Sequence, residues 1–145
     1  MYVTECSIGL DIMSNTQARD EMLRRQTESQ SSNAVSQLRA IAGLCNAGNF
    51  DAATEHLPLH DRKIIGDATD QAVLRFSESL GKVSDLRQMW KKTFELAFNS
   101  KNKFMIRTLK LVQKEGLSIA LPATDGGAFH DDDTYVVFLK VTDSY

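Results

Sequence analysis

The chain has 145 residues, 42% of them hydrophobic and 25% charged, and a formal net charge of −2 at pH 7. This length suits one domain with a core of its own, and the composition excludes an intrinsically disordered chain. No apolar run approaches the roughly 20 residues of a membrane-spanning helix, and the first residues lack the pattern of a secretory signal. We therefore expect one domain over residues 1–145, located in the cytoplasm and without membrane contact.

Alternating polarity over residues 1–12 predicts a half-buried strand, with Cys6 and Ile8 on one face. A polar run with few apolar anchors follows it and predicts a surface helix over residues 16–28. The N-terminal strand could join a sheet elsewhere in the chain as its third strand. The alternative is that residues 1–33 form a loosely packed N-terminal extension of the domain.

Helical periodicity dominates the middle of the chain, where apolar residues recur every three or four positions. Asp67 should cap one of these helices through its side-chain oxygen, and Gly81 should end that helix. The helices predicted in this part of the chain cover residues 34–47, 51–57, 68–80, 84–98 and 101–115.

After Gly116 the pattern changes from helical to alternating. Residues 117–121 and 135–141 predict the two strands of an antiparallel hairpin joined by a long polar loop. A hairpin alone is marginally stable in water, so it should pack on the helices. The predicted fold class is α+β, mainly α, with five to six helices and a C-terminal β-hairpin that the N-terminal strand could extend.

Charge is distributed unevenly along the chain. Nine basic and three acidic residues lie between positions 82 and 115, so the remaining residues are strongly acidic. On the predicted helices the basic side chains would form a face that binds a partner. The residues assigned to this basic face are Lys91, Lys92, Lys101, Lys103, Arg107, Lys110 and Lys114.

The hairpin loop holds the densest acidic cluster, and we assign it as a second binding element. Its candidate residues are Asp125, His130, Asp131, Asp132 and Asp133. These are hard metal ligands, but their spacing does not match a calcium-binding loop. His56 and His60 have the spacing of paired zinc ligands, yet Pro58 between them should break the helix that this pairing needs. We therefore predict no metal and no cofactor.

Two segments resemble known families. Leu44, the run Ala47-Gly48-Asn49-Phe50 and Ala53 are similar to the middle of a tetratricopeptide repeat, which implies two helices joined by a turn. Residues 84–141 resemble a winged-helix domain, because a leucine-rich helix ends in Gly116-Leu117 before a β-hairpin. That resemblance implies that Lys103, Arg107, Lys110 and Lys114 lie near nucleic-acid phosphates and that the 122–134 loop is the wing.

No nucleophile motif or phosphate-binding glycine loop occurs in the chain, which favours a non-enzymatic protein. The leading prediction is a small regulator, adaptor or inhibitor that binds another protein through the basic helical face (82–114) and the acidic loop (125–133). One alternative is a winged-helix-like protein that binds nucleic acid. A second is a metal-dependent enzyme that uses the acidic loop. Assembly into a homo-oligomer is left open.

Overall fold

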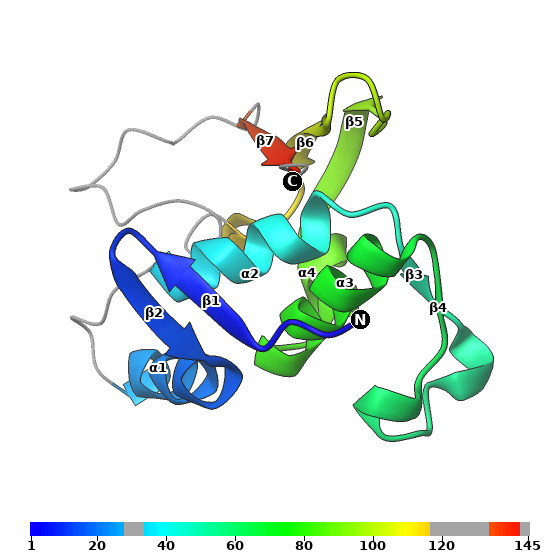
Figure 1. Cartoon of the computed structure of the whole chain (residues 1–145). Helices are drawn as coiled ribbons and strands as arrows, with labels where there is room; N and C mark the ends of the chain where they lie inside the picture. Colours follow the sequence, from blue (N-terminus) through cyan, green and yellow to red (C-terminus); the bar gives the residue numbers. More distant parts are fainter. Residues whose placement is uncertain (28–33, 117–133, 143–145) are drawn as a thin grey trace.

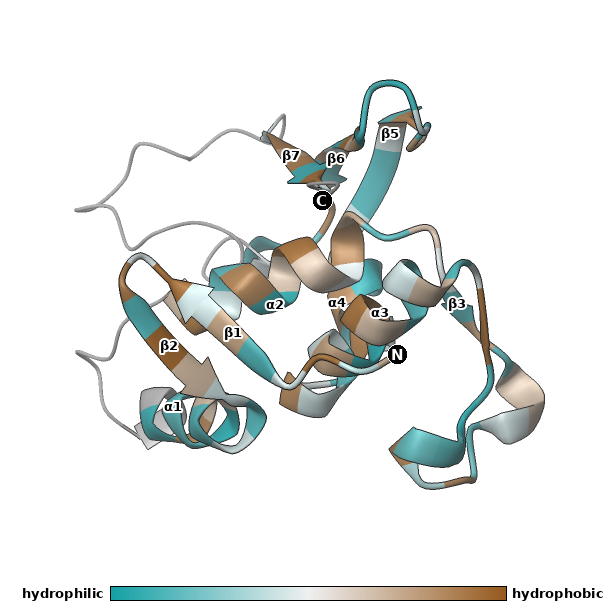
Figure 2. Ribbon diagram, in the orientation of Figure 1, coloured by the Kyte–Doolittle hydropathy of each residue, from teal (hydrophilic) through white to brown (hydrophobic). Residues whose placement is uncertain are grey.

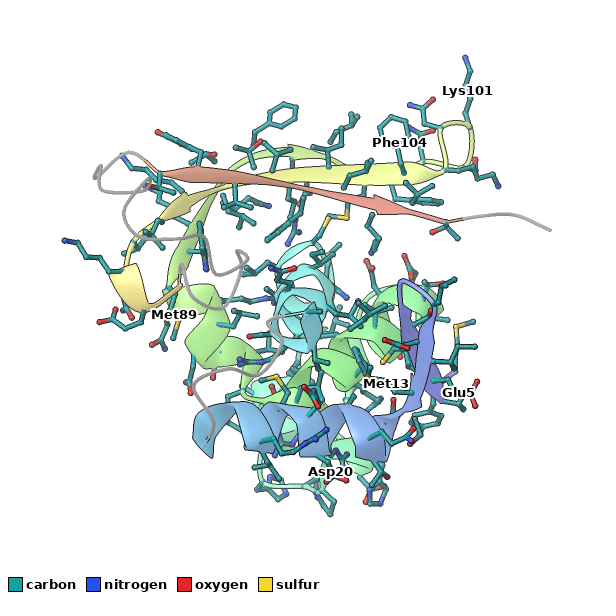
Figure 3. The ribbon with its side chains drawn as sticks, turned by 90° about the vertical axis from the view of Figure 1, so that its left-hand side faces the viewer. Glu5, Met13, Asp20, Met89, Lys101 and Phe104 are labelled. Carbon is teal, nitrogen blue, oxygen red and sulfur yellow. The ribbon has the colours of Figure 1, made fainter. Side chains whose placement is uncertain are left out.

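The computed structural model describes residues 1–27, 34–116 and 134–142. Over these ranges the chain forms four α-helices and three small antiparallel sheets. A three-stranded sheet forms one layer, and the helices pack beneath it as a second layer (Figure 3). The first helix lies on the far side of the helical layer, away from that sheet, and the N-terminal hairpin stands beside the helices (Figures 1 and 3).

The N-terminal residues form a hairpin of their own. Strands β1 (Glu5–Ile8) and β2 (Asp11–Ser14) pair across a turn in which Gly9 has a φ of 62°. Helix α1 (Asn15–Thr27) follows directly and buries Ala18 completely. Figure 2 shows that α1 is otherwise largely hydrophilic, which agrees with its narrow apolar stripe.

Three helices form the centre of the molecule: α2 (Ala34–Leu44), α3 (Ala68–Leu80) and α4 (Val83–Gln88). The side chain of Asp67 accepts a hydrogen bond of 2.8 Å from the Asp70 amide, so the predicted cap of α3 is confirmed. Gly81 ends the helix, also as predicted. Between α2 and α3, the short strands β3 (Asn49–Phe50) and β4 (Ile64–Ile65) pair and enclose two 3-10 turns, Ala52–Thr54 and Leu59–Asp61.

The main sheet has the order β5-β6-β7, formed by Trp90–Leu96, Phe104–Leu111 and Tyr135–Val141. Both pairings are antiparallel, and a 3-10 turn (Lys114–Gly116) follows β6. A β-bulge interrupts the pairing of β5 with β6 between Lys92 and Phe94. The extra residue, Thr93, anchors the bulge by donating its hydroxyl to the Thr108 carbonyl at 3.1 Å.

The two faces of this sheet differ in their surroundings. The inner face packs on α2 and α4 and buries Trp90, Met105, Leu109, Val136 and Phe138. The outer face is exposed although much of it is apolar, and the colours of Figure 2 alternate along β6 and β7 accordingly. Its large exposed hydrophobic residues are Phe94, Leu96, Tyr135, Val137, Leu139 and Val141.

The predicted fold class is wrong in its balance of helix and strand. Residues 84–98 were expected to be one helix, but α4 ends at Gln88 and β5 begins at Trp90. Residues 101–115 were also expected to be helical and instead form β6. The segment predicted as a helix over 51–57 contains one 3-10 turn. Over the described part of the chain the fold is therefore α+β with four helices and three sheets, and not mainly helical with five to six helices.

A physical reason accounts for the two misassigned segments. In β6 the inward positions are Met105, Arg107 and Leu109, so a charged residue interrupts the apolar alternation that would mark a strand. In β5 the bulge at Thr93 shifts the alternation by one position. Apolar residues three and four apart remain in both segments, and this spacing imitates a helix.

The terminal strands pair differently from the prediction. Residues 135–141 form a strand as expected, but its partner is β6, while residues 117–121 lie outside the described part of the chain. The N-terminal strand pairs with β2 and joins no larger sheet. The resemblances fail as well, because Asn49–Phe50 is a strand and the proposed recognition helix is β6. The assignment of 1–145 as one domain, with 1–33 as an extension, stays a prediction.

Neighbouring valines in β7 test the two faces of the sheet. Val136 is 8% exposed and faces the helices, whereas Val137 is 65% exposed on the outer face. We expect Val136→Thr to lower the free energy of unfolding by about 1–3 kcal/mol, because a hydroxyl would be buried in the core. Val137→Thr should change it by less than about 0.5 kcal/mol. Urea denaturation of both variants measures the difference, and equal losses would contradict this register.

Candidate functional site

The site is built around the end of helix α2, where the chain turns away at residues 43–48. Arg87 on α4 reaches this turn with its whole guanidinium group. Its Nε donates to the Gly43 carbonyl at 3.1 Å, and its Nη2 donates to the carbonyls of Asn46 at 3.3 Å and Gly48 at 2.9 Å. Its Nη1 donates to Asn49 Oδ1 at 2.8 Å. Gly43 lies in the last turn of α2, where carbonyls lack partners within the helix, and Asn46 and Gly48 follow that turn. Arg87 therefore supplies donors to the helix end and to the residues just after it.

A second arginine reaches the same turn from the sheet. Arg107 on β6 donates through Nη1 to the Leu44 carbonyl at 2.9 Å and through Nε to Glu95 Oε2 at 2.5 Å. Lys92 Nζ lies 3.3 Å from the same Glu95 oxygen. Burial alone would raise the pKa of the Glu95 carboxyl, but the hydrogen bonds and charges of Arg107 and Lys92 outweigh it and lower the pKa.

An ion pair links the third strand to helix α3. Lys140 Nζ contacts Asp70 Oδ1, and both side chains are mostly buried. The other oxygen of Asp70 accepts the Ala47 amide at 3.2 Å. Asn46, which is 1% exposed, donates its amide to the Asp70 carbonyl at 3.0 Å. The first turn of α3 is therefore tied both to the end of α2 and to β7.

A groove of about 410 Å³ lies next to these contacts, between the end of α2 and the inner face of β5 and β6. The volume lies within the range of small-molecule sites. Three of its charged residues are cationic and one is anionic, which favours a ligand with negative charge. The indole nitrogen of Trp90 is buried and has no hydrogen-bond partner among the described residues. The groove is lined by Leu44, Asn46, Ala47, Asn49, Arg87, Trp90, Lys92, Glu95, Arg107 and Leu109.

One end of the same sheet adds an aromatic ring and another cation. Phe98 follows β5 and is 41% exposed. Lys103 ends the turn between β5 and β6 with a φ of 60°, and its carbonyl accepts the Thr142 amide at 2.9 Å. The turn therefore lies beside the end of β7, close to Lys140. Figure 3 shows Lys101 at the tip of this turn and Phe104 at the start of β6.

The structure separates the residues that were assigned to one basic face. Lys92 and Arg107 meet in the groove, while Lys91 and Lys110 pair with each other across β5 and β6 on the opposite face. Lys101 and Lys103 belong to the turn at the end of the sheet, and Lys114 begins the 3-10 turn after β6. The acidic candidates Asp125, His130, Asp131, Asp132 and Asp133 lie outside the described residues.

Sequence reasoning missed the exposed ring of Phe98. It also missed the residues that join distant elements: Asn46, Asp70, Arg87, Glu95 and Lys140. One signal was available for Asp70, because it lies in the first turn of a helix that the sequence predicted correctly. For Arg87 and Lys140 no local pattern exists, since their partners are 38 or more positions away in the chain. Within the described ranges, no group of three or more metal-ligand residues comes together.

Comparison with known proteins identifies the family. The model of the P-type ATPase cytoplasmic domain N matches residues 34–121, more than half of the chain. The chain belongs to this family. It is 35% identical over 105 residues to the potassium-transporting ATPase alpha chain 2 of Cavia porcellus, covering 72% of this chain and 10% of that protein. It is 34% identical over 103 residues to the sodium/potassium-transporting ATPase subunit alpha-A of Artemia franciscana, covering 66% and 10%.

The chain thus spans about a tenth of the length of these relatives. The matched region runs from α2 through β6 and includes every residue that lines the groove. Lys140 on β7 lies beyond the matched region. The family match therefore includes the whole lining of the groove. The ion pair between Asp70 and Lys140 connects the matched region to β7, which lies outside the match.

Family membership overturns the functional predictions made from sequence. The relatives are ATPases by name, so the expectation of a non-enzymatic regulator, adaptor or inhibitor is wrong, and so is that of a nucleic-acid-binding protein. The predicted partners, which were a protein, a nucleic acid or a second copy of the chain, are therefore unsupported as well. The expectation of no membrane contact is also wrong, because the relatives are named as potassium-transporting and sodium/potassium-transporting ATPases. Over the described residues, no helix is long and apolar enough to cross a membrane.

The predicted cytoplasmic location agrees with the family at a coarse level, because the matching domain is described as cytoplasmic.

Replacement of Arg87 tests how much the stability of the fold depends on the hydrogen bonds that its guanidinium group donates. Arg87→Lys keeps the charge but cannot reach the Gly43, Asn46 and Gly48 carbonyls together. We expect the free energy of unfolding to fall by about 2–3 kcal/mol, since buried carbonyls would lose their donors. Arg19→Lys on α1, where the arginine is exposed, serves as the control. Equal midpoints for the two variants in urea would contradict this role.

Acid should remove the contribution of the Glu95 ion pair. The pKa of the Glu95 carboxyl is lower in the folded protein than in the unfolded chain. The ionised carboxylate therefore stabilises the folded protein fully at pH values above the pKa of the unfolded chain. This stabilisation is lost as the pH falls through the pKa of the folded protein. The wild type should be more stable than Glu95→Gln at about pH 7, and the difference should shrink below about pH 4. Urea midpoints across this range measure it. A difference that is constant down to about pH 3 would show that the carboxylate charge contributes nothing.

Proposed function

We propose that the chain acts as an ATP-binding N domain of an ion-transporting P-type ATPase, on the cytoplasmic side of the membrane. The match of residues 34–121 to the family model carries this proposal. The relatives are named as potassium-transporting and sodium/potassium-transporting ATPases. ATP hydrolysis coupled to transport of potassium, or of sodium and potassium, is then the activity of the whole protein to which this domain contributes.

The groove and the end of the sheet supply the chemistry that binding ATP requires. An adenine base stacks on an exposed aromatic ring, and Phe98 provides one. Phosphates need cations, and Arg107 and Lys92 lie in the groove. Lys103 belongs to the same turn as Phe98, since its amide donates at 2.9 Å to the carbonyl of Asn99, the residue after Phe98. Lys103 directly precedes β6 and is four positions from Arg107, and four residues of extended strand span roughly 13 Å. An extended nucleotide could therefore contact the turn and the groove together.

The Asp70–Lys140 ion pair supports this proposal because Asp70 also holds Asn46 and Ala47, which line the groove. Lys140 lies opposite Met105 in the register of β6 and β7, so it shares the inner face with Arg107. Asp70 neutralises Lys140 and at the same time accepts the Ala47 amide. The inner face is therefore held in place before a ligand arrives, which lowers the cost of ordering the site.

Titration of the purified chain with ATP tests this function directly. We expect Phe98→Ala and Lys103→Gln each to weaken binding roughly tenfold, through loss of stacking and of a charged contact. Lys91→Gln is the matched control, because it removes the same charge from the outer face. Isothermal titration calorimetry measures all four proteins under the same salt conditions.

Two results would contradict the proposal. One is the absence of ATP binding by the wild-type chain, with circular dichroism showing that it is folded. The other is an equal loss of affinity in Lys91→Gln and Lys103→Gln, which would indicate general charge attraction without a defined site.

A further inference from the structure

A second cavity lies far from the groove, between the N-terminal segment, α1 and α3. Its volume is about 200 Å³, and it shares no lining residue with the groove. Tyr2, Asn15, Arg19, Arg75 and Phe76 contribute to its walls. Phe76 comes from α3, and its own ring is buried in the core that α1 and α2 share. The N-terminal hairpin and α1 thus form this cavity by packing on α3.

The cavity is lined by cations without a carboxylate among its walls. Arg19 has no hydrogen bond or ion pair with any described residue, and its helical neighbours three and four positions away are not acidic. Arg75 donates through Nη1 to the Leu59 carbonyl at 2.6 Å and lies 5.9 Å from the centre of the Tyr2 ring. Its guanidinium group keeps further N–H donors for a ligand.

Two carboxylates near Arg75 and His60 are engaged elsewhere. Glu78, one turn from Arg75 on α3, binds Arg62 at 3.1 Å and accepts the Val83 amide at 2.6 Å. Asp61 lies 3.3 Å from the imidazole of His60, which also lines the cavity. The positive charge of Arg19 and Arg75 is therefore available to an anionic ligand.

Asn15 supplies a second and independent observation. Its Nδ2 donates to the Val3 carbonyl at 2.5 Å, which fixes the orientation of the amide. Its Oδ1 is buried and has no hydrogen-bond partner in the described structure. A buried acceptor without a donor is costly, so a ligand with an O–H or N–H group would relieve that cost.

The remaining walls are apolar. Tyr2, Val3, Leu59 and Phe76 present carbon surface, and most of the exposed lining is carbon. We propose that this cavity is a binding site for a small aromatic carboxylate that also carries a hydroxyl or N–H donor. The carboxylate contacts Arg19 and Arg75, the ring packs on the apolar wall, and the donor reaches Asn15 Oδ1. The proposal goes beyond ATP binding and does not depend on it.

The size of the cavity limits the ligand. A volume of about 200 Å³ lies below the range of about 300–1,000 Å³ typical of sites for drug-sized molecules. It suits a single ring with its substituents and is too small for a nucleotide. Inorganic phosphate would meet the arginines but would leave the apolar wall without a contact.

The test uses 4-hydroxybenzoate as the probe, with benzoate, phenol and inorganic phosphate for comparison. We expect 4-hydroxybenzoate to bind most tightly, benzoate to bind less tightly because it lacks the donor, and phenol and phosphate to bind weakest. Arg19→Gln and Arg75→Gln should each weaken binding of the probe about tenfold, through loss of a charged hydrogen bond. Arg24→Gln on the same helix is the control, because Arg24 does not line the cavity.

Amide shifts in NMR spectra locate the site independently of affinity. The probe should shift the amides of Asn15, Arg19 and Ser79, and saturating ATP should leave these shifts unchanged. The proposal is overturned if the folded wild type does not bind the probe. It is also overturned if phosphate binds as tightly as the probe, or if Arg24→Gln weakens binding as much as Arg19→Gln does.

Discussion

The carbonyl groups at the end of helix α2 impose the central constraint on this fold. The helix ends inside the molecule, and a buried helix end leaves carbonyls that must find donors. Here the donors come from residues far along the chain: Arg87 serves Gly43, Asn46 and Gly48, and Arg107 serves Leu44. Without both arginines in place, several buried acceptors would be left unpaired. The stability of the helix end therefore depends on both arginines.

The same helix end determines where the groove lies. Asn46 and Ala47 are hydrogen-bonded to Asp70, and Asp70 is paired with Lys140. Helices α2, α3 and α4 and strands β6 and β7 thus meet through polar contacts at one place, next to the buried apolar cluster of the inner sheet face. Polar networks of this kind specify one arrangement more strictly than apolar packing does. A groove with several fixed charges follows from this arrangement.

The sequence could predict elements whose signals are local, and only those. The cap of α3 at Asp67 and its end at Gly81 depend on neighbouring residues, and both predictions hold. Strand β6 could not be recognised, because its inward Arg107 is stabilised by Glu95 and by the Leu44 carbonyl, neither of which is adjacent in the chain. The arrangement of the candidate site could not be predicted for the same reason. Lys91 and Lys92 are adjacent in the chain, yet they lie on opposite faces of a strand that the sequence pattern predicted to be a helix.

The bulge at Thr93 has a consequence for how this strand can evolve. It inserts one residue between Lys92 and Phe94, and this extra residue lets both Lys92 and Glu95 face the helices while Phe94 faces outward. Removal of a residue from β5 on either side of Thr93 would turn part of the strand over, placing Phe94 against the arginines or Trp90 in water. Removal of Thr93 itself would leave Lys92 and Glu95 on the inner face and Phe94 on the outer face. The register of β5 on each side of the bulge is therefore fixed, because Glu95 must face Arg107.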